Sequence, residues 1–414
     1  MGYHQLHPIT SKELKGLERT MKFDNKTYML LETGSFTQKA LIAGVIGLLL
    51  SVAGAFMDHA QFFQAYLTAF TFFTTISLGG LFFVLIHHIT GAYWGVVMRR
   101  VAENVACTLP IMGLLMIPLF FGMHDLFHWS HVDDPHVMHD KILQWKAPYL
   151  NTTFFFIRNI VIFVIWSWLA HGLRTLSLAQ DAGNAESLGK MRRKAAGGTV
   201  LFAITVTIFS FDWLMSLDPH WYSTIFGVYV FSGGFLAAIA LLSILANMLR
   251  NNGAGKIVTA EHTHDLGKFL FAFTAWWAYI GGAQYFLIWY GNIPEETIWF
   301  LHRWEHGWKN VSLFMILFHF IVPFILLAFR AVKRVPVLIV SISGLTLFMH
   351  YVDQFWMINP TFNNHHFQVS WMHLTTLLGI GGIFIWWVFM KSGKDPIIAM
   401  GDPKLQKSIE HTVH

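Results

Sequence analysis

The sequence has few charged residues. Only 12% of its 414 residues are Asp, Glu, Lys or Arg, whereas a soluble domain carries about a quarter. Hydrophobic residues make up 55% of the chain, and its mean hydropathy is +0.49. Such a chain has too few polar side chains to cover a water-facing surface. The composition therefore predicts one membrane-embedded unit and not a series of soluble domains.

The sequence also lacks cysteine, apart from Cys107. One cysteine cannot form an internal disulfide, a four-cysteine iron–sulfur site or a CxxCH haem attachment. If the protein takes part in redox chemistry, its metal centres are held by histidine or lie on other chains.

Long apolar stretches recur along the chain. A helix that spans a bilayer needs about 20 mostly apolar residues, and ten windows meet that length. They are 38–57, 63–94, 102–122, 151–177, 196–217, 221–249, 267–291, 311–331, 335–357 and 368–390. The sequence therefore predicts an all-α polytopic membrane protein with ten transmembrane helices.

Lysine and arginine are distributed unevenly between the two sides of this predicted bundle. One side, which includes both termini, collects 23 of the 28 Lys and Arg residues. The positive-inside rule therefore places both termini in the cytoplasm. We expect a cytoplasmic segment at 1–37, a membrane domain at 38–391 and a cytoplasmic tail at 392–414. The basic balance thus reports topology, and we expect no nucleic-acid partner.

Ionisable residues within the apolar windows form two layers. Burying such a side chain in a bilayer costs free energy, so each residue needs a partner or a function. The layer toward the predicted cytoplasmic side contains His87, His88, Glu103 and His171. The outer layer contains Arg158, Asp212, His319, His350, Asp353 and His373. We interpret the inner set as one half of a proton pathway. Its outer half is assigned to Asp212, Asp353, His350 and Arg158.

Both outer pairs have a structural alternative. An Arg158–Asp212 ion pair that only ties two helices together explains these residues as well as a proton-carrying role does. His350 and Asp353 are three residues apart on one helix face. That spacing suits a structural hydrogen bond as well as proton transfer between two titratable groups.

The stretch FDWLMSLDPHW (211–221) separates two of the apolar windows. Asp218 precedes Pro219, and Asp at the N-cap followed by Pro at the first helical position is a common helix start. We therefore predict that both residues open the following helix and have an architectural role.

Three histidine patterns bear on a metal site, and none is specific. No window carries two histidines spaced as in membrane subunits that bind two haems. HRWEH (302–306) fits the H-x-x-E-H pattern of some zinc proteases but has no evident third ligand. The acidic and histidine-rich stretch 124–140 suits a metal site or, more simply, a solvated face that docks another protein. We expect no metal on this chain.

Two stretches carry a family resemblance: FSFDWLMSLDPHWYSTIFGVYVFSGG (209–234) and HYVDQFWMINP (350–360). With them the chain resembles membrane subunits of the polysulfide-reductase type. It is most similar to the smaller of the two such subunits in bacterial alternative complex III, a quinol:cytochrome c oxidoreductase. The resemblance implies two four-helix bundles, spans 2–5 and 6–9, with spans 1 and 10 flanking them, in the bacterial inner membrane.

The same resemblance implies partners and a role. The partners would be an iron–sulfur subunit, c-type haem subunits, a sister membrane subunit and, in some complexes, a terminal oxidase. This chain would bind no metal centre itself, only lipids, with quinol as an open candidate. It would support quinol oxidation, assembly and proton translocation. Two alternatives stay open: a purely structural scaffold of the same complex, and a secondary transporter. The near absence of charge between the two polar layers argues against the transporter.

Overall fold

The computed structural model describes residues 33–251, 257–363 and 367–412, and within these ranges the protein is all-helical, with no β-strand. The first half contains α2 Thr33–Ala55, α3 His59–Thr90, α4 Val96–Ala106, α5 Leu109–Leu115, α6 Ile117–Phe121, α7 Met123–Leu126, η1 His128–Ser130, α8 Pro135–His139, α9 Lys141–Lys146, α10 Thr152–Asp181, α11 Ser187–Trp213 and η2 Met215–Leu217. The second half contains α12 Phe226–Leu249, α13 Ala260–Gly291, α14 Pro294–His302, α15 Trp308–Met315, the π-helical segment η4 Ile316–Ile321, α16 Val322–Ala328, α17 Arg330–Arg334, α18 Pro336–Phe362, α19 Trp371–Lys394 and α20 Leu405–Ile409.

Nine helices or helix runs in the described ranges are long and apolar enough to cross a membrane. This confirms an all-α polytopic membrane protein. The seventh predicted span, 267–291, lies within α13, which has 32 residues but does not belong to those nine. Its stretch WWAYIGGAQY (276–285) is rich in Trp, Tyr, Gly and Gln, and these residues lower its mean hydropathy. A tenth span therefore stays a prediction.

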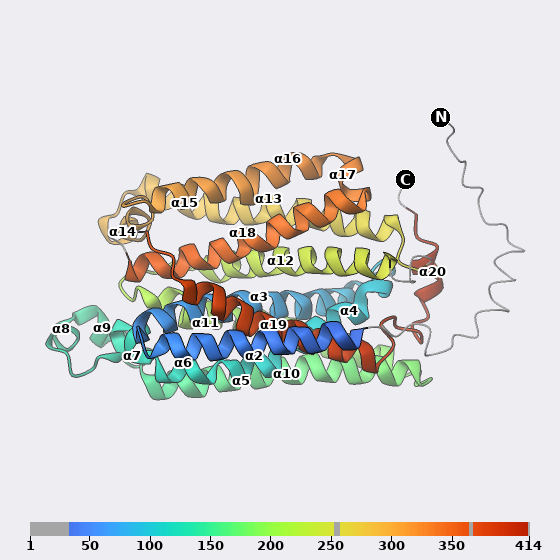
Figure 1. Cartoon of the computed structure of the whole chain (residues 1–414), viewed down its shortest axis with the longest axis horizontal. Coiled ribbons are helices and arrows are strands. Elements are labelled where there is room, and N and C mark those ends of the chain that lie inside the picture. Colours follow the sequence, from blue (N-terminus) through green and yellow to red (C-terminus); the bar gives the residue numbers. More distant parts are fainter. Residues whose placement is uncertain (1–32, 252–256, 364–366, 413–414) are drawn as a thin grey trace, which may run out of the picture.

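Helices α3 and α12 lie side by side through the middle of the molecule (Figure 1). Nearly every residue of α3 from Phe62 to His88 is buried, as expected of a helix that is apolar on all sides. Glycines permit the close contact with α12: a Cβ at Gly79 would lie 2.6 Å from the carbonyl oxygen of Gly234. Helices α4 and α11 also pack against α3, whereas α13 packs against α12, and α18 contacts both central helices.

Helices α2 and α19 form a second close pair, although they come from opposite ends of the chain (Figure 1). Glycines face each other along the contact: a Cβ at Gly47 would lie 2.6 Å from the backbone nitrogen of Gly379, and one at Gly382 would lie 2.5 Å from the Cα of Gly44. Small residues at such a crossing let two backbones approach closely. Both helices of the pair contact α3, and α19 does so more extensively.

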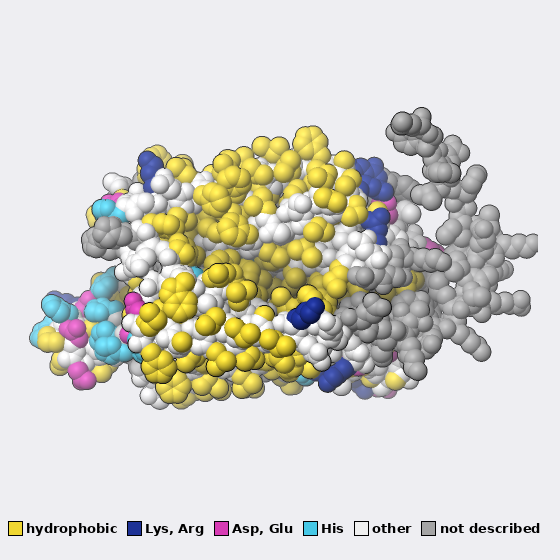
Figure 2. Space-filling model, in the orientation of Figure 1, with side chains coloured by type: hydrophobic (Ala, Val, Ile, Leu, Met, Phe, Trp, Pro, Cys, Tyr) yellow, Lys and Arg dark blue, Asp and Glu magenta, His cyan; other side chains and the backbone are white. Residues whose placement is uncertain are grey.

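The two ends of the helical bundle differ in charge. Figure 2 shows an apolar surface between them, with His, Asp and Glu side chains gathered over α8 and α9 at one end. We call this the α14 end, because α14 also lies there, and the opposite one the α20 end (Figure 1). At the α20 end, the segment after α19 packs against the bundle: Asp395 pairs with Arg174 at 2.7 Å, and the Ser408 hydroxyl donates to the Trp94 carbonyl at 2.9 Å.

The structure corrects the predicted helix start at Asp218 and Pro219. Helix α12 begins only at Phe226, and Asp218 instead ends the short helix η2. The intervening segment packs against α14, where the Trp221 ring stacks on Trp299 at a centroid distance of 4.5 Å. The Trp221 indole also donates to a carbonyl of α14, that of Glu296, at 3.1 Å. This tertiary contact holds the residues after Pro219 out of the helix.

Candidate functional site

The four residues of the predicted outer pathway lie in two separate groups. Arg158 of α10 and Asp212 of α11 form a two-pronged ion pair, with both nitrogen–oxygen distances 2.8 Å. Asp212 also accepts hydrogen bonds from the Tyr149 hydroxyl and the Asn159 amide, each at 3.0 Å. Asp212 is fully buried, and Arg158 is 8% exposed. Every oxygen of this carboxylate is thus occupied by protein donors.

His350 and Asp353 of α18 form the other group, and their surroundings are different. Asp353 accepts a hydrogen bond from the Tyr229 hydroxyl at 2.5 Å and from the Trp277 indole at 3.3 Å. No Lys or Arg pairs with it in the part of the chain that the structure describes. The Nε2 atom of His350 lies 2.9 Å from the Thr75 hydroxyl of α3. Asp353 is therefore a buried carboxyl group whose neighbours are all neutral donors.

Gly233 of α12 leaves room beside these two side chains. A Cβ at this position would lie 3.2 Å from Nδ1 of His350 and 3.4 Å from Oδ2 of Asp353. That Nδ1 atom is buried and has no hydrogen-bond partner among the described residues. His350 and Asp353 thus both lie against α12 at Gly233.

A third titratable side chain, His319, lies behind Trp277. Its ring meets the Trp277 ring edge-on at a centroid distance of 4.1 Å. His319 is 1% exposed, and neither ring nitrogen has a partner within the described ranges. The residue lies in the π-helical segment η4, and such segments are rare and often occur at functional sites. It was noted in the outer polar layer of the sequence but was not assigned to the pathway.

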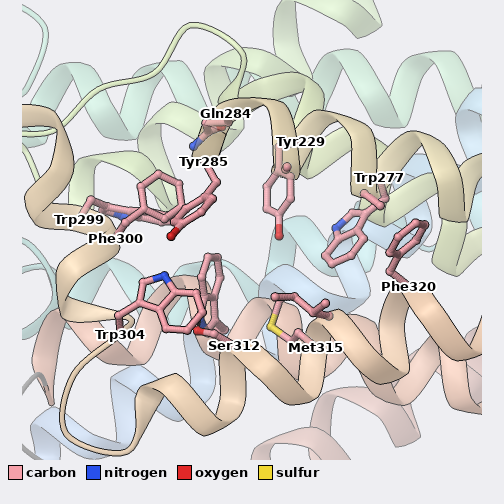
Figure 3. Close-up of a pocket in the computed structure, with 15 residues that line it drawn as sticks. Tyr229, Trp277, Gln284, Tyr285, Trp299, Phe300, Trp304, Ser312, Met315 and Phe320 are labelled. Carbon is pink, nitrogen blue, oxygen red and sulfur yellow. Dashed lines mark hydrogen bonds between the residues drawn. The ribbon is translucent and has the colours of Figure 1, made fainter. Parts of the chain in front are cut away.

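A cavity of about 310 Å³ lies beside Tyr229 and Trp277, the two hydrogen-bond donors to Asp353 (Figure 3). Its volume is within the usual range for small-molecule sites, about 300–1,000 Å³. Side chains from α12, α13, α14, α15, η4 and α18 line it, and most of them are aromatic or aliphatic. The principal ones are Tyr229, Trp277, Gln284, Tyr285, Trp299, Phe300, Trp304, Ser312, Met315, Phe320 and Trp356.

Two lining residues connect the cavity to the buried carboxyl group. Tyr229 and Trp277 each line the cavity and each donate a hydrogen bond to Asp353. Figure 3 shows the Tyr229 hydroxyl directed into the space between α13 and the helix that carries Met315. A ligand in the cavity would therefore contact the two direct donors to Asp353. A polar group of this kind behind an apolar wall is what fixes the orientation of a bound ring.

One buried cation supports the cavity wall from the α14 end. Arg303 is 1% exposed, and its guanidinium stacks over Trp299 at 3.4 Å from the ring centroid. It donates to the carbonyls of Trp299, Trp356 and Met357 at 2.7, 3.2 and 2.7 Å. Pro360 has no N–H, so the Trp356 carbonyl lacks its usual helical donor, and Arg303 replaces it. Burial lowers the pKa of Arg303 to about 9.

The predicted inner pathway is assembled only in part. Glu103 lies between Arg99 and Arg100, at 3.3 and 3.2 Å, and these arginines also pair with Asp402 and Asp181. This buried network joins α4 to α10 and to the chain after α19.

The three inner histidines are placed differently from one another. The adjacent rings of His87 and His88 are buried, with their centroids 5.5 Å apart. The Nε2 atom of His88 has no partner among the described residues. His171 of α10, in contrast, is exposed on the surface.

Among the described residues, no three His, Cys, Asp or Glu side chains come close enough to hold a metal ion together. In the stretch 124–140, the ring of His124 stacks on His131 at 3.6 Å, and Asp125 pairs with His59 at 2.7 Å. Asp140, the N-cap residue of α9, pairs with His220 at 2.6 Å.

Sequence reasoning missed the cavity and with it the roles of Tyr229, Trp277 and Gln284. The available signal was the density of aromatic residues at 276–308. Comparison with protein-family models and with curated proteins finds no match, so the family resemblance stays a prediction.

Proposed function

We propose that this chain is the smaller polysulfide-reductase-type membrane subunit of a quinol:cytochrome c oxidoreductase of the alternative complex III type. The resemblance of 209–234 and 350–360 supports the family, and the nine long apolar helices agree with it. In this proposal, ten spans form two four-helix bundles with α2 and α19 beside them, and both termini are in the cytoplasm of a bacterium. The partners are an iron–sulfur subunit, c-type haem subunits, a sister membrane subunit and a terminal oxidase in some complexes.

The observation that carries the proposal is the aromatic cavity with the buried carboxyl group of Asp353 behind its wall, a group that pairs with no Lys or Arg among the described residues. A flat quinol ring suits a space lined by Tyr229, Trp299 and Trp356, since aromatic rings stack favourably. Oxidation of a quinol releases two protons and two electrons. The electrons pass to the partner iron–sulfur subunit. Asp353 accepts one of the two protons through the Tyr229 hydroxyl, which takes it from a quinol hydroxyl as it gives its own to the carboxylate. The other quinol hydroxyl releases the second proton to internal water.

Protons leave Asp353 through neighbouring titratable groups in this proposal. His350 shares the Gly233 face with Asp353, and His319 lies on the other side of Trp277. Both imidazoles have nitrogens without a partner in the described structure, so they are free to exchange protons with internal water. His87, His88 and Glu103 would serve the cytoplasmic half in the same way. His171, exposed on α10, is the weakest member of that set.

A scaffold function is the second candidate, and Arg158–Asp212 favours it for the first half of the chain. Four hydrogen bonds hold the Asp212 carboxylate, two from Arg158 and one each from Tyr149 and Asn159. A carboxylate with this many donors and a bound cation strongly favours one charge state, which suits helix fixation better than proton transfer. We therefore assign the scaffold role to this pair and the proton role to Asp353.

Purification of the tagged chain in mild detergent tests the proposal. We expect iron–sulfur and c-type haem subunits to co-purify, with a haem visible spectrum and quinol:cytochrome c oxidoreductase activity. Asp353→Asn should assemble with the same partners and lose most of that activity. A colourless, solitary protein would contradict the proposal and would favour a secondary transporter.

A further inference from the structure

Gln284 contributes an unused polar group to an otherwise apolar cavity. Its side chain lines the cavity and is 6% exposed, and its Oε1 atom has no hydrogen-bond partner among the described residues. Buried amide oxygens are nearly always paired, because an unpaired one loses its hydration without compensation. A ligand that brings a hydrogen-bond donor would satisfy this atom.

The position of Gln284 relative to Trp277 restricts the shape of such a ligand. The two residues are seven positions apart on α13, which is two helical turns on one face and about 10.5 Å of rise. Trp277 and Tyr229 lie next to Asp353, and Gln284 lies two turns farther along the α13 wall of the cavity. A six-membered ring with oxygens at opposite carbons, about 5.5 Å apart, spans about 11 Å once a hydrogen bond of about 2.8 Å is added at each oxygen.

The cavity opens on the outer surface of the helical bundle, which suits a ligand dissolved in lipid. Three of its lining residues are on that surface: Gly282, Tyr285 with 36% of its area exposed, and Ile316 with 46%. A Cβ at Gly282 would meet no atom within 4 Å, so the space beside this part of α13 is open and would stay open with a small side chain. An apolar tail can therefore stay in the bilayer while the ring occupies the cavity.

We propose that Gln284 is a positioning residue that binds the second oxygen of a para-dioxygenated ring whose first oxygen faces Tyr229. The proposal rests on the quinol function above. It assigns to Gln284 a preference of the cavity for rings with oxygens on two opposite carbons. The amide suits both redox forms, because its oxygen accepts from a quinol hydroxyl and its NH₂ group donates to a quinone carbonyl.

Gln284→Leu tests this inference in the purified complex, with Gln354→Leu as the matched control. Gln354 is also a buried glutamine without a hydrogen-bond partner in the described structure, but it does not line the cavity. Binding of a short-chain alkylhydroquinone and of the corresponding 3-alkylphenol, in which hydrogen replaces one hydroxyl and the chain keeps its place, is measured by calorimetry. We expect the wild-type complex and Gln354→Leu to prefer the hydroquinone about tenfold. Gln284→Leu should bind both ligands with the affinity of the phenol.

Two results would overturn the inference alone: an unchanged preference in Gln284→Leu, or an equal loss of affinity for both ligands, which is what a merely structural glutamine predicts. A wild-type complex that binds neither ring would overturn the quinol function of this cavity as well.

Discussion

Asp212→Asn should destabilise the protein strongly. The Asp212 carboxylate accepts two hydrogen bonds from Arg158, each 2.8 Å long, and neither side chain is more than 8% exposed. An asparagine keeps one acceptor oxygen, but its NH₂ group faces the N–H donors of Arg158 and Asn159. The substitution also leaves the positive charge of Arg158 without its countercharge. Leaving one buried charge without its partner costs about 3–5 kcal/mol. We expect a loss of that size in the free energy of unfolding.

Asp353→Asn should have a much smaller effect on stability, although Asp353 is buried as deeply. Its hydrogen-bond partners, Tyr229 and Trp277, are neutral donors. The asparagine oxygen can still accept from Tyr229, and no charge is left behind. The expected loss is about one hydrogen bond, or about 1 kcal/mol.

Unfolding in mixed detergent micelles with increasing SDS measures both effects on the purified protein. The double variant Arg158→Met with Asp212→Leu is the control. It removes both charges together and should recover most of the stability lost in Asp212→Asn. The reasoning is refuted if Asp212→Asn is as stable as wild type, or if Asp353→Asn is the more destabilised of the two.

Two further predictions concern the cavity and the α14 end. Gly281→Ala should displace Tyr229, whose ring a new Cβ would approach to 2.9 Å, and lower quinol oxidation, whereas Gly282→Ala meets no atom and should leave the rate unchanged; equal rates in both variants would contradict this. The hydrogen bond from His220 lowers the pKa of Asp140, so the stability it adds is present above the ordinary carboxyl pKa and lost as the pH falls below about 4. Limited proteolysis of the α8–α9 segment should therefore be faster at pH 3 than at pH 6. Equal rates at the two pH values would argue against this contact.

Much of the fold could be predicted because the bilayer imposes a simple rule on sequence. Apolar stretches of about 20 residues identify membrane helices whatever their neighbours are. The rule is least effective for α13, where stretches such as WWAYIGGAQY build an aromatic cavity wall and lower the apolar signal.

Tertiary contacts explain where local patterns failed. The Asp218–Pro219 pair has the chemistry of a helix start, but Trp221 stacks on Trp299, which is 78 positions later in the chain. No local pattern contains that partner. The cavity depends on long-range contacts in the same way, since its lining extends from Tyr229 to Trp356.

The polar residues show the same division. Hydropathy identified Asp212 and Asp353 as costly residues that need an explanation, but it could not separate them. Only the neighbours do so: Asp212 faces a cation, and Asp353 faces two neutral donors. Gln284 carried no signal, since an isolated glutamine in an aromatic stretch has no pattern of its own.

The most direct test of the central claim is the rate of quinol oxidation by the purified complex with Asp353→Asn, measured beside Asp212→Asn at equal haem content. We expect Asp353→Asn to lower the rate about a hundredfold while the complex stays assembled, because a proton acceptor contributes about that much. Asp212→Asn should keep its rate for as long as the protein stays folded. A wild-type rate in Asp353→Asn would contradict the account.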